Sequence, residues 1–415
     1  MPFFLLATIG AVVAFGLTAV ATVLVRRAAL RWAWTDEPDG HRKLHSAVTP
    51  SAGGIAIFVG AAGATGLVLW AASQGGLGGA GLHPIAYVGA LAMVAVGAYD
   101  DIHGLGFKPK FVVEIVVAYA LLHGGYRIDL SALPFIGSDV YLGALYSIPL
   151  TILWVVGVIN AVNLIDGIDG LASGVVAIAF ASMALAFGIR GDLTLVLVAL
   201  VFVGALAGFL VHNFNPASIF MGDSGSLFLG YVLAVYTLSS PANSDPALAP
   251  VVPLLALGFP LLDTSLSMAR RVAERRGMFA ADRDHIHHRM ADRMSVPRAV
   301  AALYLVSAGF GMLAVVASST GGVGVAMTVA AAVALAAGLI VRLGYVRLPY
   351  DSPQLVEVDP RDPADASVTR PPDMVPGTVA PGAAASDTAA PGAAVPSVPE
   401  GEDAEQIPDL APHYG

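Results

Sequence analysis

The sequence predicts an all-α, polytopic membrane protein with about eleven transmembrane helices and a disordered C-terminal tail. Of its 415 residues, 56% are hydrophobic and only 12% are charged. Apolar stretches of about twenty residues recur, and each can cross a hydrocarbon core of ~30 Å. The alternation typical of outer-membrane strands is absent. The expected spans are 3–25, 52–72, 84–99, 111–125, 147–162, 171–189, 193–212, 225–240, 247–269, 299–317 and 322–342.

Basic residues predict the orientation of these spans. Arg26, Arg27 and Arg31 follow the first span, which indicates a retained helix with its N-terminus outside and not a cleaved signal peptide. In this topology 19 of the 21 Lys and Arg residues face the cytoplasm, and only Arg127 and Arg190 lie outside. The C-terminus is then cytoplasmic.

The composition changes near residue 350 and predicts two parts. Residues 1–350 form the membrane domain. Residues 351–415 hold 12 of the 27 prolines and 12 of the 30 acidic residues, without an apolar period, and predict a disordered cytoplasmic tail. The net charge of −9 therefore belongs to the tail. The chain has no cysteine, which excludes disulfides and thiolate metal sites.

Five short polar clusters interrupt the apolar chain, and this topology places all of them on the cytoplasmic side. Because carboxylates at a membrane are costly, a function is the first hypothesis for them. The clusters are 36–45 (DEPDGHRKLH), 100–101, 160–170 (NAVNLIDGIDG), 213–226 (NFNPASIFMGDSGS) and 282–289 (DRDHIHHR).

The pair Asp100–Asp101 ends the third expected span, and Lys108 and Lys110 follow it. Adjacent carboxylates suit phosphate chemistry, in which one takes a proton or faces a metal while the other pairs with a base. The alternative is a solvated helix end, although acids are unfavourable at the negative end of the helix dipole.

Asn160, Asn163, Asp166 and Asp169 recur every three residues, with glycines between them. This spacing keeps side chains near one face of a helix, and such oxygen ligands suit Mg²⁺. The alternative, that Asp169 only caps the sixth span, explains one acid and not four polar groups.

At the start of the eighth span stand Asp223, Ser224 and Ser226. The N–H groups of a helix N-terminus can receive a phosphate, and Asp223 can hold Mg²⁺. Capping of the helix is the alternative. Phe220 can stack on a nucleobase, but core packing explains a single phenylalanine equally well.

The fifth cluster contains His285, His287, His288 and Arg289. A zinc site normally gathers further ligands, and HEXXH is absent, so a diphosphate clamp of imidazoles and arginine is favoured. Asp263, nearer a span interior, is expected to pair with Arg270.

These motifs together resemble the polyprenyl-phosphate N-acetylhexosamine-1-phosphate transferases, relatives of the phospho-MurNAc-pentapeptide transferase. The resemblance covers Asp36 to about Arg293 and rests on DEPDGHRKLH with TPSAGG, YDD, NAVNLIDGIDGLASG, NFNPASIFMGDSGSLFLG and DTSLSMARR with FAADRDHIHHR. It implies catalytic roles for Asp100, Asp101, Lys110, Asp166 and Asp169, and metal ligation by Asp223 and Asn163. It implies substrate binding by Arg42, Lys43, His45, Asn213, Phe220, Ser226, His285, His287, His288 and Arg289.

The implied reaction is transfer of a sugar-1-phosphate from a UDP-N-acetylhexosamine, best UDP-GlcNAc, to undecaprenyl or decaprenyl phosphate, with release of UMP. It begins a cell-envelope glycan such as lipopolysaccharide, teichoic acid or arabinogalactan, at the cytoplasmic face of a bacterial inner membrane. Mg²⁺ is the expected cofactor, with Mn²⁺ as a substitute. Direct attack is favoured over an aspartyl-phosphate intermediate. No nucleic-acid partner is expected, and a homodimer is left open.

Three alternatives stay open at this point. The donor can be UDP-MurNAc-pentapeptide rather than UDP-GlcNAc. An ion- or proton-coupled transporter also uses intramembrane acids and broken helices, but its acids lie near the membrane midplane and not at one surface. The third alternative is a scaffold for an envelope complex, but this function does not explain the five motifs.

Overall fold

The computed structural model of the chain describes residues 2–36, 49–74, 82–128, 140–239, 251–275 and 285–345. These residues form helices and one two-stranded antiparallel sheet, β1 Thr35–Asp36 with β2 Thr49–Pro50. The helices are α1 Phe3–Arg31, α2 Gly53–Gln74, α3 Pro84–His103, α4 Phe107–His123, α5 Val140–Ile165, α6 Leu171–Ile189, α7 Leu193–Asn213, α8 Gly222–Leu238, α9 Val251–Ala256, α10 Gly258–Ala273, α11 Ile286–Ala291, α12 Val296–Ser319 and α13 Gly322–Arg342.

Helix α8 lies at the centre of the bundle. Every residue from Ser224 to Leu238 is buried, and α2, α3 and α5 pack around it. Glycines allow close contacts here: a Cβ on Gly97 of α3 would clash with the carbonyl oxygen of Asp223, and one on Gly230 would lie 2.6 Å from Ile159 of α5. The backbone at the start of α8 is thereby fixed by the packing of its neighbours.

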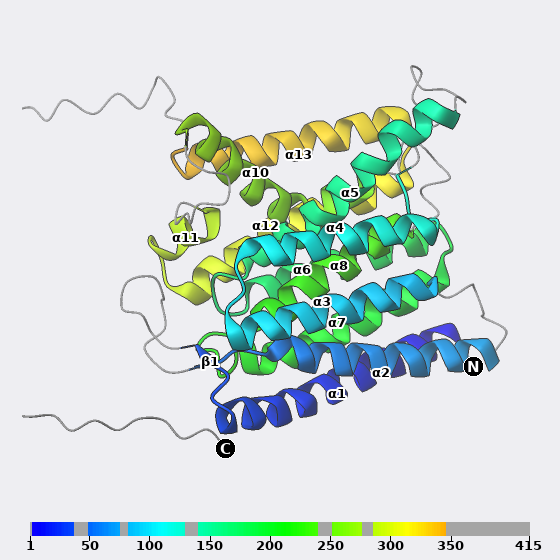
Figure 1. Ribbon diagram of the computed structural model, residues 1–415. Helices are drawn as coiled ribbons and strands as arrows, with labels where there is room; N and C mark the ends of the chain where they lie inside the picture. The colour runs from blue at the N-terminus through cyan, green and yellow to red at the C-terminus, as the bar shows by residue number, and fades with distance from the viewer. Residues whose placement is uncertain are drawn as a thin grey trace, which may run out of the picture. The chain divides into compact units, whose positions relative to one another are not determined.

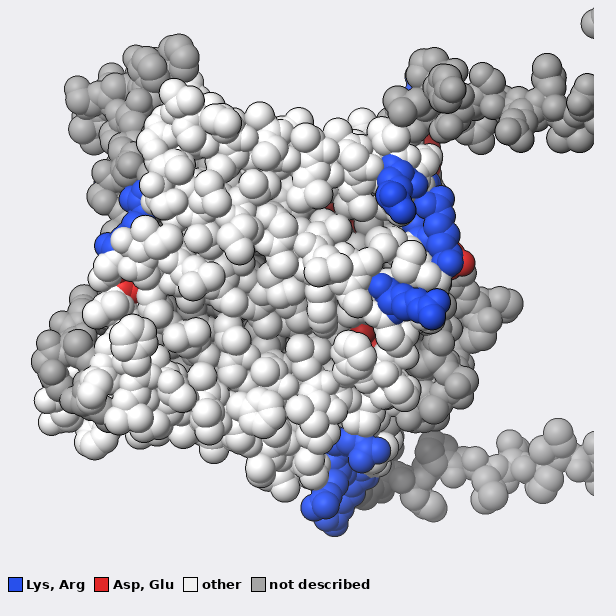
Figure 2. Space-filling model, turned by 180° about the vertical axis from the view of Figure 1, so that it is seen from behind, with Lys and Arg blue, Asp and Glu red and all other residues white. Residues whose placement is uncertain are grey.

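Eight of the described helices are long and apolar enough to cross a membrane, which confirms a polytopic all-α membrane protein. They are α1, α2, α3, α6, α7, α12, α13 and the part of α5 from Leu145 to Ile165. Helices α4 and α8, also expected as spans, have 17 residues each. Figure 2 shows one face that is almost free of charge across its middle, with Lys and Arg mainly along one edge.

The ninth expected span, 247–269, is not one continuous helix, and this prediction is wrong. Its described part is divided into α9 and α10, with a break at Leu257. Pro260 explains the break, because a proline has no N–H to donate and its ring crowds the carbonyl four residues earlier. Helix α10 also buries Asp263 and Ser267, so it does not present an apolar surface all round.

Four of the five polar clusters have described residues at their centre, and these lie at one end of the bundle. The C-terminal ends of α3, α5 and α7 meet the N-terminal ends of α4, α6 and α8 there, beside α11 (Figure 1). The prediction that these clusters share one end is therefore confirmed. The first cluster, except Asp36, and the tail 351–415 lie outside the described residues.

Candidate active site

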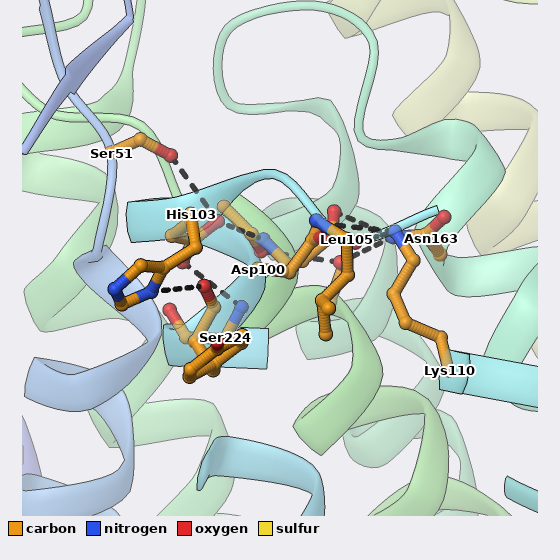
Figure 3. A network of polar contacts seen from close by, with 12 residues as sticks. Ser51, Asp100, His103, Leu105, Lys110, Asn163 and Ser224 are labelled. Carbon is orange, nitrogen blue, oxygen red and sulfur yellow. Dashed lines mark hydrogen bonds and ion pairs between the residues drawn. The ribbon is translucent and has the colours of Figure 1, made fainter. Parts of the chain in front are cut away.

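Lys110 of α4 joins two carboxylates from different helices. Its Nζ lies 3.0 Å from Oδ2 of Asp100, at the end of α3, and 2.6 Å from Oδ2 of Asp223, at the start of α8 (Figure 3). The other oxygen of Asp100 accepts a hydrogen bond from the backbone N–H of Leu105. Gly104, with a φ of +70°, makes the tight turn that starts α4 so soon after α3. Lys110 therefore reaches Asp100 as expected, but its second partner is Asp223 and not Asp101.

Asp101 has a different task from its neighbour, because it caps α8. Its Oδ1 accepts the N–H of Asp223 at 2.7 Å, and its Oδ2 accepts the N–H of Ser224 at 3.1 Å. A carboxylate is well placed at the positive end of a helix. Gly222 has a φ of +70°, and a Cβ there would lie 2.6 Å from each Asp101 oxygen. These two N–H groups at the start of α8 are therefore already bonded to Asp101, so the expected binding of a phosphate at this helix N-terminus stays a prediction for the remaining groups.

Asn163 connects the end of α5 to α8. Its side-chain N–H group donates to Oδ1 of Asp223 at 3.1 Å and to the hydroxyl of Ser226 at 2.9 Å (Figure 3). The hydroxyl of Ser226 is fully buried and donates to the carbonyl of Gly222. Ser226 thus orients Asn163, which is a different role from the expected contact with substrate. Both N–H bonds of Asn163 go to protein, and its amide oxygen accepts no hydrogen bond from the residues that the structure describes.

The backbone N–H of Asp166 donates to the carbonyl of Asn163 at 3.3 Å, but among the described residues its carboxylate has no hydrogen-bond or ion-pair partner. It follows α5 directly and faces other acids. Burial, together with the negative charges of Asp223, Asp101 and Asp169, raises the pKa of Asp166 to about 8. With this pKa the carboxyl is largely protonated at pH 7, and a bound cation would favour its ionised form. Together with Asp223 and the amide oxygen of Asn163, it offers a set of oxygen donors suited to Mg²⁺.

Asp169 holds the segment between α7 and α8. Its Oδ2 accepts hydrogen bonds from the side chain of Asn215 and from the backbone N–H of Ala217, both at 2.9 Å. The alternative considered above, that Asp169 only caps α6, does not hold, since the N-cap residue is Gly170 and no side chain caps this helix. Asp169 therefore links two of the polar clusters.

Asn213, expected to hold a nucleoside, is directed into the protein. It is 3% exposed, donates to the carbonyl of Ile219 and accepts from the hydroxyl of Ser173. Phe220 is half-buried, and its backbone pairs with the segment before α2, where its N–H donates to the carbonyl of Pro50. These contacts fix the shape of the segment from 214 to 221.

The histidine cluster is organised by Asp263 of α10, which the sequence did not connect to it. Asp263 is 1% exposed. Its Oδ1 accepts the N–H of Ile286 at 2.6 Å, and its Oδ2 lies 2.9 Å from Nδ1 of His287 and 3.3 Å from Nδ1 of His285. These three side chains lie close enough together to hold a metal ion. The expected partner, Arg270, instead lies 5.9 Å from the ring centre of Tyr345.

Two histidines of this cluster reach the acidic segment after α5. A Cβ on Gly167 would lie 2.6 Å from Nε2 of His287 and 3.4 Å from Nε2 of His288. Burial, together with the neighbouring His287 and His285, lowers the pKa of His288 to about 4. His288 is therefore neutral at pH 7 and offers a hydrogen bond, not a charge.

Arg289, expected in the clamp, faces the end of α13. Its guanidinium lies 4.0 Å from the ring centre of Tyr345, and it donates to the carbonyl of Leu343. It anchors α11 through a cation–π contact. Arg42, Lys43 and His45 lie outside the described residues, so their roles stay predictions.

The chain is similar to known membrane transferases. A family model described as glycosyl transferase family 4 matches residues 83–240. The chain is 35% identical over 301 residues to a probable undecaprenyl-phosphate N-acetylglucosaminyl 1-phosphate transferase of Bacillus subtilis, covering 72% of this chain and 82% of the relative. It is 34% identical over 352 residues to a decaprenyl-phosphate N-acetylglucosaminephosphotransferase of Mycolicibacterium smegmatis, covering 78% and 86%. The undecaprenyl-phosphate alpha-N-acetylglucosaminyl 1-phosphate transferase of Salmonella typhi is 29% identical over 281 residues, with 66% and 73% covered.

Proposed function

We propose that this chain, which belongs to the polyprenyl-phosphate N-acetylhexosamine-1-phosphate transferase family, moves GlcNAc-1-phosphate from UDP-GlcNAc to a polyprenyl phosphate and releases UMP. The observation that carries the proposal is the Lys110 bridge between Asp100 and Asp223. Asn163 donates to Asp223, and the charge of Asp223 acts on Asp166, so both residues adjoin this bridge. This arrangement of one ammonium among several carboxylates suits phosphate transfer at a membrane surface. The polar end of the bundle is proposed to face the cytoplasm of a bacterial cell.

In the proposed reaction an oxygen of the lipid phosphate attacks the sugar-bearing phosphorus of UDP-GlcNAc. A new P–O bond forms, the bond from that phosphorus to the bridging oxygen breaks, and UMP leaves with the electron pair. The lipid phosphate is already a competent nucleophile, so direct attack needs no enzyme-bound intermediate. Asp100 is the candidate to accept any proton that remains on the attacking phosphate. Lys110 offsets negative charge between the two carboxylates while two anionic phosphates approach.

The donor set fits Mg²⁺, because Asp223, Asn163 and Asp166 provide oxygen atoms and no sulfur or nitrogen. When bound, Mg²⁺ neutralises the diphosphate and the charge that develops on the leaving group. Asp101 holds the start of α8 and so fixes Asp223. Asp169 and Asn213 shape the segment that is proposed to enclose the nucleotide.

UDP-GlcNAc is proposed as the donor because the relatives above are named for N-acetylglucosaminyl phosphate transfer. Purified protein in detergent should release UMP when UDP-GlcNAc, Mg²⁺ and undecaprenyl or decaprenyl phosphate are all present. Mn²⁺ should substitute for Mg²⁺, and EDTA should stop the reaction. If the protein releases UMP from UDP-MurNAc-pentapeptide but not from UDP-GlcNAc, the donor is UDP-MurNAc-pentapeptide and the proposed donor is wrong. A protein that releases no UMP but moves an ion or solute across liposomes would refute the enzyme and favour a transporter.

The same assay tests the role of Asp101. If Asp101 acts by capping α8, Asp101→Ala should lower stability by roughly 0.5–2 kcal/mol and turnover together. Asp101→Asn keeps one acceptor, so both losses should be smaller. Thermal unfolding and UMP release are measured on each variant. A loss of turnover that is equal in both variants, without any change in unfolding temperature, would instead make Asp101 a catalytic group.

A further inference from the structure

Asp263 is a buried carboxylate for which the proposed chemistry has no use. Both of its oxygens are engaged by the segment that carries the histidines: Oδ1 by the N–H of Ile286, and Oδ2 by Nδ1 of His287 at 2.9 Å. It therefore fixes both the backbone at the start of α11 and the ring of one histidine. The residue lies on α10, in the broken segment that replaces the ninth expected span.

The ring of His287 has one nitrogen committed and one unpartnered. The residue is fully buried, and in the part of the chain that the structure describes its Nε2 has no hydrogen-bond partner. This atom lies where a Cβ on Gly167 would stand 2.6 Å away. Gly167 follows Asp166, whose carboxylate has no hydrogen-bond partner among the described residues. A buried ring nitrogen without a hydrogen-bond partner destabilises the fold. Its presence therefore points to a partner that binds during function.

We propose that Asp263 is a positioning residue for His287. By accepting the proton on Nδ1 it holds the ring in one orientation and directs Nε2 to the acidic segment, where the diphosphate of the nucleotide sugar binds. The carboxylate also offsets the charge that the ring carries when Nε2 holds a proton for a phosphate oxygen, as an aspartate does for a catalytic histidine. This inference rests on the proposed function, because it needs a nucleotide diphosphate at this segment.

A metal ion bound by Asp263, His285 and His287 is the competing interpretation. The hydrogen-bond interpretation is favoured for two reasons. The 2.9 Å between Nδ1 and Oδ2 is an ordinary N–H···O length. Structural zinc takes four ligands, and only three side chains of the described residues gather here.

A double-mutant cycle tests the proposal. Asp263→Asn, His287→Ala and the double variant are purified in the same detergent, and UDP-GlcNAc binding in Mg²⁺ is measured by calorimetry. Each single variant should weaken binding by roughly tenfold, as expected when one hydrogen bond to a charged group is lost. The double variant should bind no more weakly than His287→Ala, because Asp263 acts through that ring. Ser267→Ala is the matched control: Ser267 contacts Nε2 of His285 in the same pocket, and binding should stay unchanged.

Several results would overturn the proposal. Additive losses in the cycle would mean that Asp263 supports the fold independently of His287. One equivalent of zinc in the purified protein, lost in Asp263→Asn, would make these nitrogens metal ligands. If Asp263→Asn does not fold, Gly167→Ala disturbs the same ring from its other side, and unchanged UDP-GlcNAc binding in that variant would refute the proposal. Wild-type protein that releases no UMP from UDP-GlcNAc refutes the proposed function instead, so the two failures are distinguishable.

Discussion

Asp223→Asn should lower UMP release by roughly a thousandfold, while the protein still inserts and folds. Both neighbours of this side chain are donors, because Lys110 Nζ binds Oδ2 and the amide N–H group of Asn163 binds Oδ1. An asparagine must turn its own NH₂ group toward one of them, whichever way the amide is placed. The substitution also removes one of the charges proposed to hold Mg²⁺. Loss of the cation and loss of the network therefore coincide.

The measurement is UMP release over a Mg²⁺ titration, with thermal unfolding as the test of folding. Asp192→Asn is the matched control, because Asp192 also stands at a helix start, where its Oδ1 accepts the N–H of Leu195 at 3.0 Å. Asparagine caps helices as well as aspartate does, so this variant should keep turnover within a few-fold of wild type. Mg²⁺-dependent turnover near the wild-type rate in Asp223→Asn would remove Asp223 from the metal site.

The position of Asp223 shows what the sequence could predict and what it could not. Its place at the start of an apolar span, beside Gly222 and Ser224, was sufficient to predict a polar group at a helix N-terminus. The group that caps that helix, Asp101, lies 122 residues earlier in the chain. Since a carboxylate cap and a bound phosphate satisfy the same N–H groups, the local sequence does not distinguish them. Only the packing of α3 against α8, through Gly97, decides between them.

The sequence does indicate the break between α9 and α10, but the continuous hydropathy of this stretch favoured a single span. Gly258 and Pro260 stand in the middle of the apolar stretch, and a proline there ends a helix about four residues earlier. Once the helix is broken, α10 turns Asp263 toward the histidines. Asp263 and Arg270 both lie in α10, so the break does not separate them; their pairing was expected from local spacing alone, which does not reveal partners from other segments. The actual partners, His285 and His287, come from a segment more than twenty residues later.

Lys110→Gln should reduce kcat for UMP release by roughly a hundredfold. Lys110 is the ammonium between Asp100 and Asp223, with distances of 3.0 and 2.6 Å. Without Lys110, two half-buried carboxylates face each other and the incoming phosphates with no fixed positive charge between them. The repulsion between these negative charges raises the free energy of the site, and burial of the carboxylates increases this penalty. Lys110→Arg should recover only part of the loss, because a planar guanidinium does not replace a compact ammonium.

The dependence on Mg²⁺ separates this variant from Asp223→Asn. In Lys110→Gln the proposed oxygen ligands are all present, and a competing cation has been removed from Asp223, so the apparent affinity for Mg²⁺ should not weaken although kcat falls. In Asp223→Asn, kcat and the apparent affinity for Mg²⁺ should both fall. Lys108→Gln, at an exposed position two residues earlier, is the matched control and should behave as wild type. A Lys110→Gln enzyme within a few-fold of wild type, or one no worse than Lys108→Gln, would show that the Lys110 bridge has no part in the reaction.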